Sequence, residues 1–198
     1  MKDLIHHILD VARMKKVDYA DIRIVRRLNE EIGVKNGKVE ALIHDSDFGF
    51  GIRVLFRGAW GFASSSKVTK TEMETVFRKA LKIAKASSKA RGKNLFFSSL
   101  IPVVDRFQTP ISVNPFHVST EAKLELLFKA DEILRRDKKV RISESFMGSY
   151  KTEKTFASTQ DAYIEQEIVE CGAGISATAI EGGEIQVRSY PNSFRGNF

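Results

Sequence analysis

The sequence contains very little cysteine, histidine and proline, and these shortages already limit what the protein can be. Its 198 residues include one cysteine, four histidines and four prolines. The single cysteine, Cys171, cannot form an internal disulfide, which is typical of a protein in a reducing compartment. The longest apolar runs, such as Leu95 to Phe97, are only a few residues long, whereas a membrane-spanning helix needs about 20 and a signal sequence about 7–15. We therefore expect no membrane span, no secretory signal and a cytoplasmic location.

The remaining composition is that of a folded protein with an excess of positive charge. Hydrophobic residues make up 42% and charged residues 29%, which excludes a disordered or fibrous chain. Lysine and arginine outnumber aspartate and glutamate by 32 to 25, a net charge of +7. The segment from residue 78 to residue 93 holds seven basic residues and no acidic one. This balance favours acidic partners or nucleic acid.

The first half of the chain is predicted to form an α+β unit over residues 1–92. Its opening helix, residues 3–16, has Asp3 as the candidate N-cap. Strands with an alternating pattern follow, joined by turns at Asn36-Gly37 and Arg57-Gly58, with Trp60 and Phe62 on the returning strand. We count a four-stranded antiparallel meander. Gly49 and Gly51 leave one strand face bare for the close approach of a backbone or a helix. Thr69 and Glu72 then form the capping box of a second helix, in which we expect these residues to be buried: Met73, Val76, Phe77, Ala80, Leu81 and Ala84.

The second half is predicted to form another α+β unit over residues 119–198, after a proline-containing connection at residues 93–118. Ser119 or Thr120 caps a third helix, for which we predict a buried stripe of Ala122, Leu126, Leu127, Ala130, Ile133 and Leu134. Antiparallel strands follow at residues 140–150, 152–159, 162–180 and 184–190, with turns at Lys151, residues 160–161 and residues 182–183. The strand at 162–180 is unusually long, so a bend or bulge is expected at Gly172 or Gly174. The final edge strand has no cover, which suggests that the chain continues into a further domain.

No constellation of side chains predicts a catalytic or metal-binding site. His6 and His7 are adjacent on a helix and point about 100° apart, so helical spacing does not let them chelate one ion. His44 beside Asp45 and Asp47 is more typical of a turn, and His117 lies at the start of the third helix. Cys171 belongs to a small-residue strand face and is expected to be a buried structural thiol. The run Gly49 to Gly51 lies inside a strand and lacks the third glycine of a nucleotide-binding loop. We therefore predict no catalytic and no metal-binding residues.

Two surfaces are nevertheless candidate binding sites. Nucleic acid could bind a basic face of the second helix formed by Arg78, Lys79, Lys82, Lys85 and Lys89, although these residues are also what the solvated side of an amphipathic helix contains. An extended peptide could add to the long strand beside Ser176 and Thr178.

Three ordered segments resemble the TldD/PmbA family of zinc metallopeptidases, also described as modulators of DNA gyrase. Residues 19–23 (YADIR) resemble the family's opening strand, and residues 35–40 (KNGKVE) resemble its first hairpin. Residues 49–54 (GFGIRV) followed by residues 61–63 (GFA) resemble its glycine-arginine hairpin. Farther on, residues 119–134 and the strands up to Arg188 fit the family's middle region in order and length.

The resemblance implies a peptidase portion without its own metal site. In TldD-type subunits a His-Glu-x-x-x-His helix binds zinc, and this sequence contains no His-Glu pair. By this resemblance the catalytic half would begin beyond Phe198, and no cofactor belongs to this chain. Residues 188–198 resemble the approach to that half in TldD-type members, which favours this subunit type over PmbA.

The leading hypothesis is therefore the N-terminal, substrate-guiding and assembly part of a TldD-type zinc-dependent peptidase, inactive alone. The expected partners are a second TldD/PmbA-type subunit or a second copy, and unfolded peptide; neither nucleic acid nor a membrane is an expected partner. Two alternatives are a stand-alone interaction module that oligomerises through its edge strands, and a nucleic-acid-binding protein.

Overall fold

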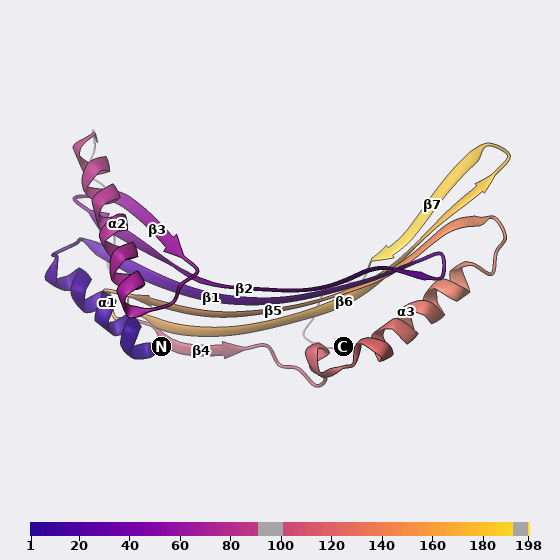
Figure 1. The fold of residues 1–198 in the computed structure, drawn as a ribbon, viewed down its shortest axis with the longest axis horizontal. Helices are drawn as coiled ribbons and strands as arrows, with labels where there is room; N and C mark the ends of the chain where they lie inside the picture. The colour runs from indigo at the N-terminus through magenta and orange to yellow at the C-terminus, as the bar shows by residue number, and fades with distance from the viewer. Residues whose placement is uncertain (91–100, 192–197) are drawn as a thin grey trace. The chain divides into compact units, whose positions relative to one another are not determined.

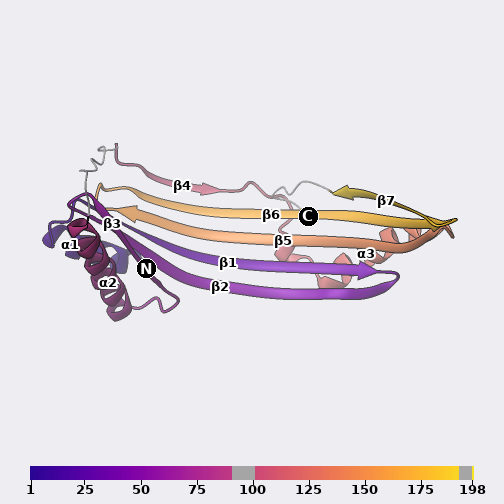
Figure 2. The same ribbon diagram turned by 90° about the horizontal axis from the view of Figure 1, so that it is seen from above.

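The protein is described by a computed structural model that covers residues 1–90, 101–191 and 198. In chain order the elements are α1 (Lys2–Met14), β1 (Tyr19–Lys35), β2 (Lys38–Phe56), β3 (Ala59–Ser65), α2 (Lys70–Lys89), β4 (Val104–Gln108), the 3-10 turn η1 (Pro115–His117), α3 (Thr120–Leu134), β5 (Val140–Ser158), β6 (Tyr163–Glu181) and β7 (Glu184–Pro191). The strands form one sheet in the order β3-β2-β1-β5-β6-β4, and β7 pairs with β6 (Figures 1 and 2). This confirms the predicted α+β fold with antiparallel meanders.

The chain divides into two compact units that are interleaved in the sequence. The first unit contains Met1–Arg26, Asp47–Phe107 and Glu153–Glu167, and the second contains Arg27–Ser46, Gln108–Thr152 and Ile168–Phe198. Strands β1, β2, β5 and β6 contribute residues to both. The domain division predicted from the sequence, at residues 1–92, 93–118 and 119–198, stays a prediction. The compact units differ from it, since each is built from three separate stretches of chain.

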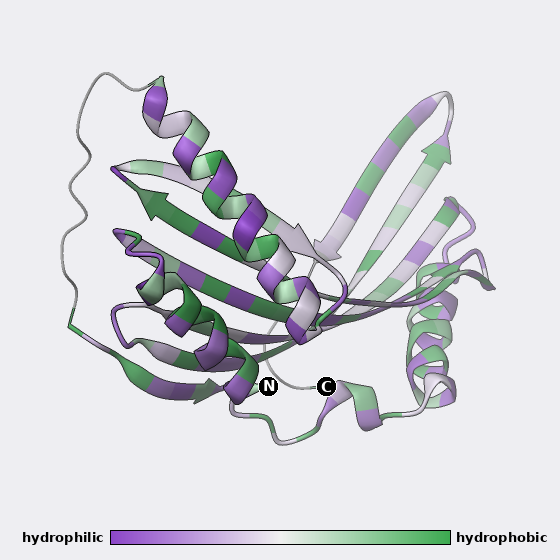
Figure 3. Cartoon of the chain, turned by 60° about the vertical axis from the view of Figure 1, so that its left-hand side comes forward, coloured by the Kyte–Doolittle hydropathy of each residue, from purple (hydrophilic) through white to green (hydrophobic). Residues whose placement is uncertain are grey.

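Helix α2 of the first unit buries the face that the sequence predicts, whereas α1 begins differently from the prediction. Its N-cap is Met1, without a side-chain cap, and Asp3 lies inside the first turn. In α2 the Thr69 hydroxyl accepts a hydrogen bond from the Glu72 amide at 3.3 Å, as the capping box requires. All six residues predicted to be buried in α2 are buried. Figure 3 shows the resulting alternation of hydrophobic and hydrophilic bands along this helix.

The first half contains three strands, and the predicted four-stranded meander is wrong. Strand β2 runs without a break for 19 residues. The polar stretch around Asp45 and Asp47, which indicated a turn, lies within this strand and is exposed. The two predicted turns are confirmed, because Asn36, Gly37, Arg57 and Gly58 have φ values of 47°, 75°, 47° and 69°.

The close approach of a helix occurs at Gly61. At Gly49 the predicted close approach of a backbone is confirmed, because a Cβ atom there would lie 3.0 Å from the Ser65 carbonyl oxygen. A Cβ atom at Gly61 would lie 2.1 Å from the Ala80 carbonyl oxygen and 2.5 Å from the Ala84 amide nitrogen. Gly51 instead makes room for the ring of Phe62, which a Cβ atom there would meet at 2.8 Å. The sequence therefore predicted the close backbone at Gly49, but it did not predict the approach of α2 at Gly61.

The buried face of α3 also differs from the prediction. Ser119 caps the helix as expected, its hydroxyl accepting from the Ala122 amide at 3.2 Å. Leu127 is buried as predicted, but the other residues buried beneath the helix are Lys123 and Asp131. Leu126 and Ile133, predicted to be buried, are 50% and 51% exposed. The apolar stripe read from the sequence thus lies mainly on the outer side of the helix.

Two further corrections concern the strands after residue 100. No turn occurs at Lys151, because β5 is one strand of 19 residues. The expected irregular connection contains β4, although residues 93–100 of that connection lie outside the described residues. Strand β6 has the predicted exceptional length of 19 residues. It pairs with β7 residue by residue, without an offset, from Glu181↔Glu184 to Gly174↔Pro191. The turns at Asp161 and at Gly182-Gly183 are confirmed by their positive φ angles. Among the described residues, the structure contains no helix of the length and hydropathy needed to cross a membrane.

Candidate functional site

His6, His7 and His44 each contact an aromatic or acidic side chain. His6 stacks on Tyr163 with ring centroids 6.1 Å apart, and His7 Nε2 lies 2.7 Å from Glu74 Oε1, linking α1 to α2. His44 Nε2 lies 3.5 Å from Glu30, and His117 is part of η1. Across residues 1–90 and 101–191, no group of three or more histidine, cysteine, aspartate or glutamate side chains is placed to hold a metal ion.

Cys171 is buried, as the sequence predicts, and the Ser149 hydroxyl donates to its sulfur at 3.6 Å. It lies in the second unit's small hydrophobic cluster with Ile32, Val34, Leu127 and Met147. This placement supports a structural thiol.

The five basic residues proposed for nucleic acid all lie exposed on α2. Four of them, Arg78, Lys82, Lys85 and Lys89, line a shallow depression of about 400 Å³ together with Leu81 and Ala86. Lys85 Nζ lies 5.2 Å from the ring centroid of Phe56, and Arg78 donates to the Thr75 hydroxyl at 3.0 Å. Lys79 lies beside this depression on the same helix. Nucleic-acid binding by this face stays a prediction.

Ser176 and Thr178 lie on β6, where they are partly buried. Their Cα partners on β7 are Ser189 and Val187, so the backbone next to them is already paired on that side. A peptide that adds to the sheet here would meet the outer edge of β7. The role of these two hydroxyls in peptide binding also stays a prediction.

The second unit contains a buried polar network that the sequence analysis missed. Lys123 is fully buried and its ammonium group pairs with the nearly buried carboxylate of Glu30. Asp131, also fully buried, accepts from the Gly37 amide at 2.8 Å, from Arg135 Nε at 2.7 Å and from the Ser143 hydroxyl at 2.6 Å. Lys123, Leu127 and Asp131 are spaced four residues apart and form one row along α3. This four-residue spacing could have revealed the row from the sequence. However, a helix face that carries two charged residues is interpreted as solvated unless their partners are known.

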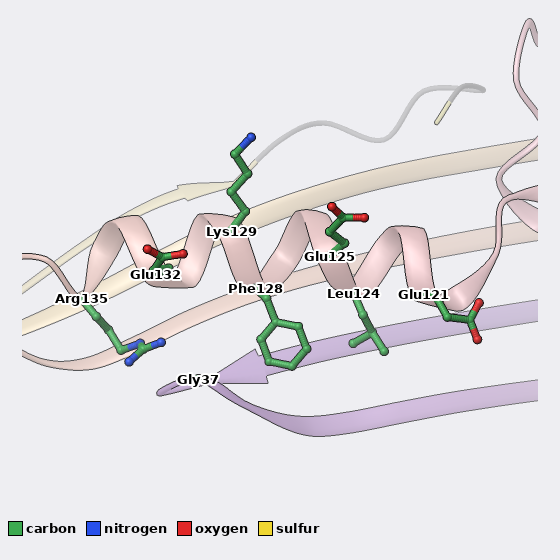
Figure 4. A pocket seen from close by; sticks show the side chains of 8 residues that line it. All are labelled: Gly37, Glu121, Leu124, Glu125, Phe128, Lys129, Glu132 and Arg135. Carbon is green, nitrogen blue, oxygen red and sulfur yellow. The ribbon is translucent and has the colours of Figure 1, made fainter.

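A groove of about 670 Å³ runs along α3 beside this network. Leu124 and Phe128 point from the helix toward the strands, whereas Lys129 points away (Figure 4). The other lining residues are Gly37, Glu121, Glu125, Glu132 and Arg135. The groove has apolar walls and a rim of mixed charge.

A cluster of interacting charged and aromatic side chains lies at the surface of the first unit, around Arg53 and Trp60. Asp21 is buried, and Arg53 holds its carboxylate through Nη2 at 2.6 Å and Nε at 2.9 Å. The same guanidinium lies 5.2 Å from the Trp60 ring centroid, and Tyr19 meets Trp60 edge-on with centroids 5.8 Å apart. Arg53, Trp60, Gly61, Phe62 and Ile83 line a depression of about 360 Å³.

The register of the β2–β3 hairpin explains why these side chains gather. Trp60 lies opposite Leu55, and Phe62 lies opposite Arg53, whereas the core residues Ile52 and Val54 face Ala63 and Gly61. Neighbouring residues in a strand point to opposite faces, so Trp60 and Phe62 face away from α2. The sequence predicted the returning strand but did not reveal this outward face.

The Asp21 carboxylate contributes to raised pKa values of both Arg53 and Tyr19. The hydrogen bonds to Asp21 raise the pKa of the Arg53 guanidinium above its usual value. Burial, followed by the nearby Asp21 carboxylate, raises the pKa of the Tyr19 phenol to about 12. The cluster therefore presents a fixed cation and a neutral phenol beneath exposed aromatic rings.

These features define an α+β protein with surfaces suited to binding, and with no group of metal-ligating side chains in the part of the chain that the structure describes. Comparison with known families gives its relationship. The chain belongs to the TldD/PmbA metallopeptidase family: residues 20–84 match PmbA/TldA metallopeptidase domain 1, and residues 113–197 match the PmbA/TldA metallopeptidase central domain. This confirms the resemblance found in the sequence.

Curated relatives agree with this membership. A metalloprotease of Methanocaldococcus jannaschii is 30% identical over 85% of this chain, and a metalloprotease of Methanothermobacter thermautotrophicus is 30% identical over 86%. The chain spans 37% and 36% of the lengths of these two relatives.

The fold is shared with solved structures of low sequence identity. A candidate modulator of DNA gyrase from Thermotoga maritima has a TM-score of 0.77 at 15% identity, over 99% of this chain and 43% of that protein. TldE from Thermococcus kodakarensis has a TM-score of 0.75 at 15% identity, over 96% of this chain and 43% of that protein. At these identities the comparison establishes the fold.

Proposed function

We propose that this chain supplies the N-terminal, substrate-guiding and assembly part of a TldD-type zinc-dependent peptidase, and that the metal ligands come from residues outside this sequence. The observation that supports the proposal most directly is the ordered match to domain 1 and to the central domain of the family, over residues 20–84 and 113–197. The names of the relatives, metalloproteases and TldE, indicate the activity to which such a part would contribute.

The chemistry of the chain's own residues is consistent with a metal site formed by residues outside this sequence. Zinc in peptidases is held by three protein ligands and leaves one position for water or substrate. The described residues offer no such set, and the sequence has no His-Glu pair. No catalytic step is therefore assigned to side chains of this chain.

The part proposed for these residues is to hold an unfolded peptide in an extended conformation. Strand addition satisfies the backbone of a substrate irrespective of its sequence, which suits a peptidase that accepts unfolded segments. Ser176 and Thr178, with β7 beside them, are the candidate residues in the second unit.

The proposal is tested first with the purified chain alone. We expect no hydrolysis of fluorescently labelled casein, with or without added zinc, and less than stoichiometric zinc by elemental analysis after dialysis. Chelator-sensitive hydrolysis, or one tightly held zinc ion per chain, would show that the metal site belongs to this chain and would refute the proposal.

The assembly role requires a second experiment. The portion of the Methanocaldococcus jannaschii metalloprotease that this chain does not match is produced separately and mixed with this chain. Analytical ultracentrifugation is expected to show a mixed complex, and a complex that also gains chelator-sensitive peptidase activity would support substrate guiding. Self-association without a mixed complex would instead support the alternative, a stand-alone oligomerising module.

A further inference from the structure

The outer edge of β3 has the properties of a docking site that no function discussed so far uses. Within the described residues, β3 pairs with β2 alone. Exposed strand edges in proteins are usually protected by charged side chains or proline, which hinder pairing with another chain. The sequence of β3, AWGFASS, contains neither.

Other strands with an outer edge carry that protection. Strand β7 contains Glu184 and Arg188, and β4 contains Asp105 and Arg106. The unprotected edge is therefore a particular property of β3 among these three strands.

Large apolar side chains surround this edge. Trp60, Phe62 and Ile83 are 37%, 56% and 39% exposed, and together with Arg53 and Gly61 they line the depression of about 360 Å³. Tryptophan and arginine are the residue types that contribute most to binding at protein interfaces. Arg53 is held in place by Asp21, so the floor of the depression is already ordered before any ligand arrives.

The charge beside the depression selects the kind of partner. Lys79 lies one helical turn before Ile83 on α2. Lys82, three residues after Lys79, lines the neighbouring basic depression; both are exposed, and residues 78–93 contain no acidic side chain. A second copy of this chain paired edge to edge would bring two such basic helices together, and like charges oppose that arrangement. An acidic segment would be attracted.

We propose that the β3 edge binds an extended, acidic segment of a partner protein by strand addition, with alternate apolar side chains on Trp60 and Phe62 and the intervening acidic side chains toward Lys79 and Lys82. Side chains alternate between the two faces of a strand, so a sequence that alternates apolar and acidic residues fits both surroundings. Six residues span about 20 Å, close to the length of β3. This site is independent of the proposed peptidase role.

The test uses Trp60, the only tryptophan in the chain, as a reporter at the site. The probe is a capped hexapeptide of alternating glutamate and valine, titrated into the full chain while the tryptophan emission is recorded. We expect a saturable blue shift. The peptide in which lysine replaces glutamate is expected to bind at least about tenfold more weakly. Two further peptides carry N-methyl groups on one or the other alternate set of amides, and one of them should lose binding because strand pairing uses one set.

Variants assign the binding to this surface. Phe62→Ser and Ile83→Ser each remove part of the apolar wall, and Lys79→Glu with Lys82→Glu reverses the charge; each is expected to weaken binding about tenfold. Lys38→Glu with Lys138→Glu is the matched control, because it makes the same charge change at exposed positions in the second unit and should bind normally. Circular dichroism verifies that each variant is folded, and Ile83→Ser, on the exposed side of α2, keeps the test valid if Phe62→Ser is not.

Several results would overturn the proposal. They are the absence of a shift up to millimolar peptide, equal binding of the lysine peptide, full binding of both N-methylated peptides, or an unchanged affinity in the charge-reversed variant. A single-stranded oligothymidylate that competes with the peptide would identify a nucleic-acid site instead. Self-association of the wild type that Phe62→Ser abolishes would identify a second copy as the occupant.

Discussion

Lys123 and Glu30 form an ion pair that the surrounding protein removes almost completely from water. Burying both charges is costly, and their mutual attraction offsets that cost only while both are present. The pair joins α3 to β1 within the second unit. Its contribution is therefore best measured by removing one charge and then both.

Lys123→Met is expected to lower the free energy of unfolding by about 3–5 kcal/mol, because it leaves the Glu30 carboxylate buried without its cation. The double variant Lys123→Met with Glu30→Leu removes both charges and is expected to recover most of that loss. Urea unfolding of the wild type, both single variants and the double variant measures the coupling. A loss in the double variant equal to the sum of the two single losses would mean that the pair has no mutual stabilisation.

Tyr19 gives the first unit a pH dependence at alkaline pH. Its pKa in the folded protein is about 12, against an ordinary value of 10.0, because burial and then the Asp21 carboxylate oppose the phenolate. Between these two values the unfolded chain has lost the proton that the folded chain keeps, so stability falls as pH rises from about 10 to 12, by up to about 1.4 kcal/mol per pH unit. Below pH 10 the stabilisation is complete.

Tyr19→Phe should therefore flatten the stability profile between pH 10 and pH 12. Thermal or urea unfolding measured across this range, wild type minus variant, isolates Tyr19 from the lysines that titrate in both proteins. Tyr163, whose pKa burial and Glu165 also raise to about 12, keeps part of the alkaline loss in the variant. An identical slope in the two proteins would contradict the assignment to Tyr19.

At the scale of the elements, α2 and α3 show what sequence patterns can and cannot resolve. The apolar residues of α2 form one stripe with a basic face opposite, so a single orientation satisfies the pattern and all six predicted residues are buried. In α3, Leu126 and Leu127 belong to two neighbouring rows. The predicted stripe included both, and most of its other residues share the row of Leu126. The structure buries the row Lys123-Leu127-Asp131, because Glu30, Gly37 and Ser143 supply partners for its charges.

The candidate site at β3 could not be predicted from the sequence, for a related reason. The hairpin, its turn and the apolar returning strand could be predicted from the sequence. The face on which each side chain lies depends on the register, which places Phe62 opposite Arg53. The ion pair of Asp21 with Arg53 joins residues 32 positions apart. No local pattern specifies such a contact, whereas the basic face of α2 follows from the sequence alone.

The packing of α2 on β3 depends on the absence of a side chain at Gly61. Gly61→Ala would place its Cβ atom 2.1 Å from the Ala80 carbonyl oxygen, and a helix backbone cannot yield as a flexible side chain does. We expect a loss of about 3 kcal/mol or more. Gly33→Ala is the control, since its Cβ atom would lie 3.6 Å from its nearest neighbour, the Ala41 Cβ atom, and is expected to cost no more than about 1 kcal/mol.

Chemical unfolding of both glycine variants measures this difference. A loss at Gly33→Ala as large as that at Gly61→Ala would indicate a general cost of replacing strand glycines in this sheet, and not a specific contact with α2.

At the scale of the whole molecule, the interleaving of the two units predicts how fragments behave. The first unit needs residues 153–167, and Ala157 and Tyr163 from that stretch contribute to its hydrophobic core. A fragment of residues 1–92 contains α1, α2 and β1–β3 but lacks these side chains and the strand next to β1.

We expect this fragment to unfold at lower urea concentration and with a smaller m-value than the full chain, because it buries less surface. Circular dichroism monitored through a urea titration provides the measurement. A cooperative transition that matches the full chain would instead show that the predicted boundary at residue 92 separates autonomous domains.

The neighbours β1 and β5 begin at Tyr19 and Val140, so ribosomes must add more than a hundred residues before this pair can form. At about 5–20 residues per second, β1 waits roughly 6–24 seconds for its partner. During synthesis the inner edge of β1 is thus available to chaperones or to other nascent chains. Slow codons between residues 66 and 139 would lengthen that interval and should raise the yield of aggregated protein.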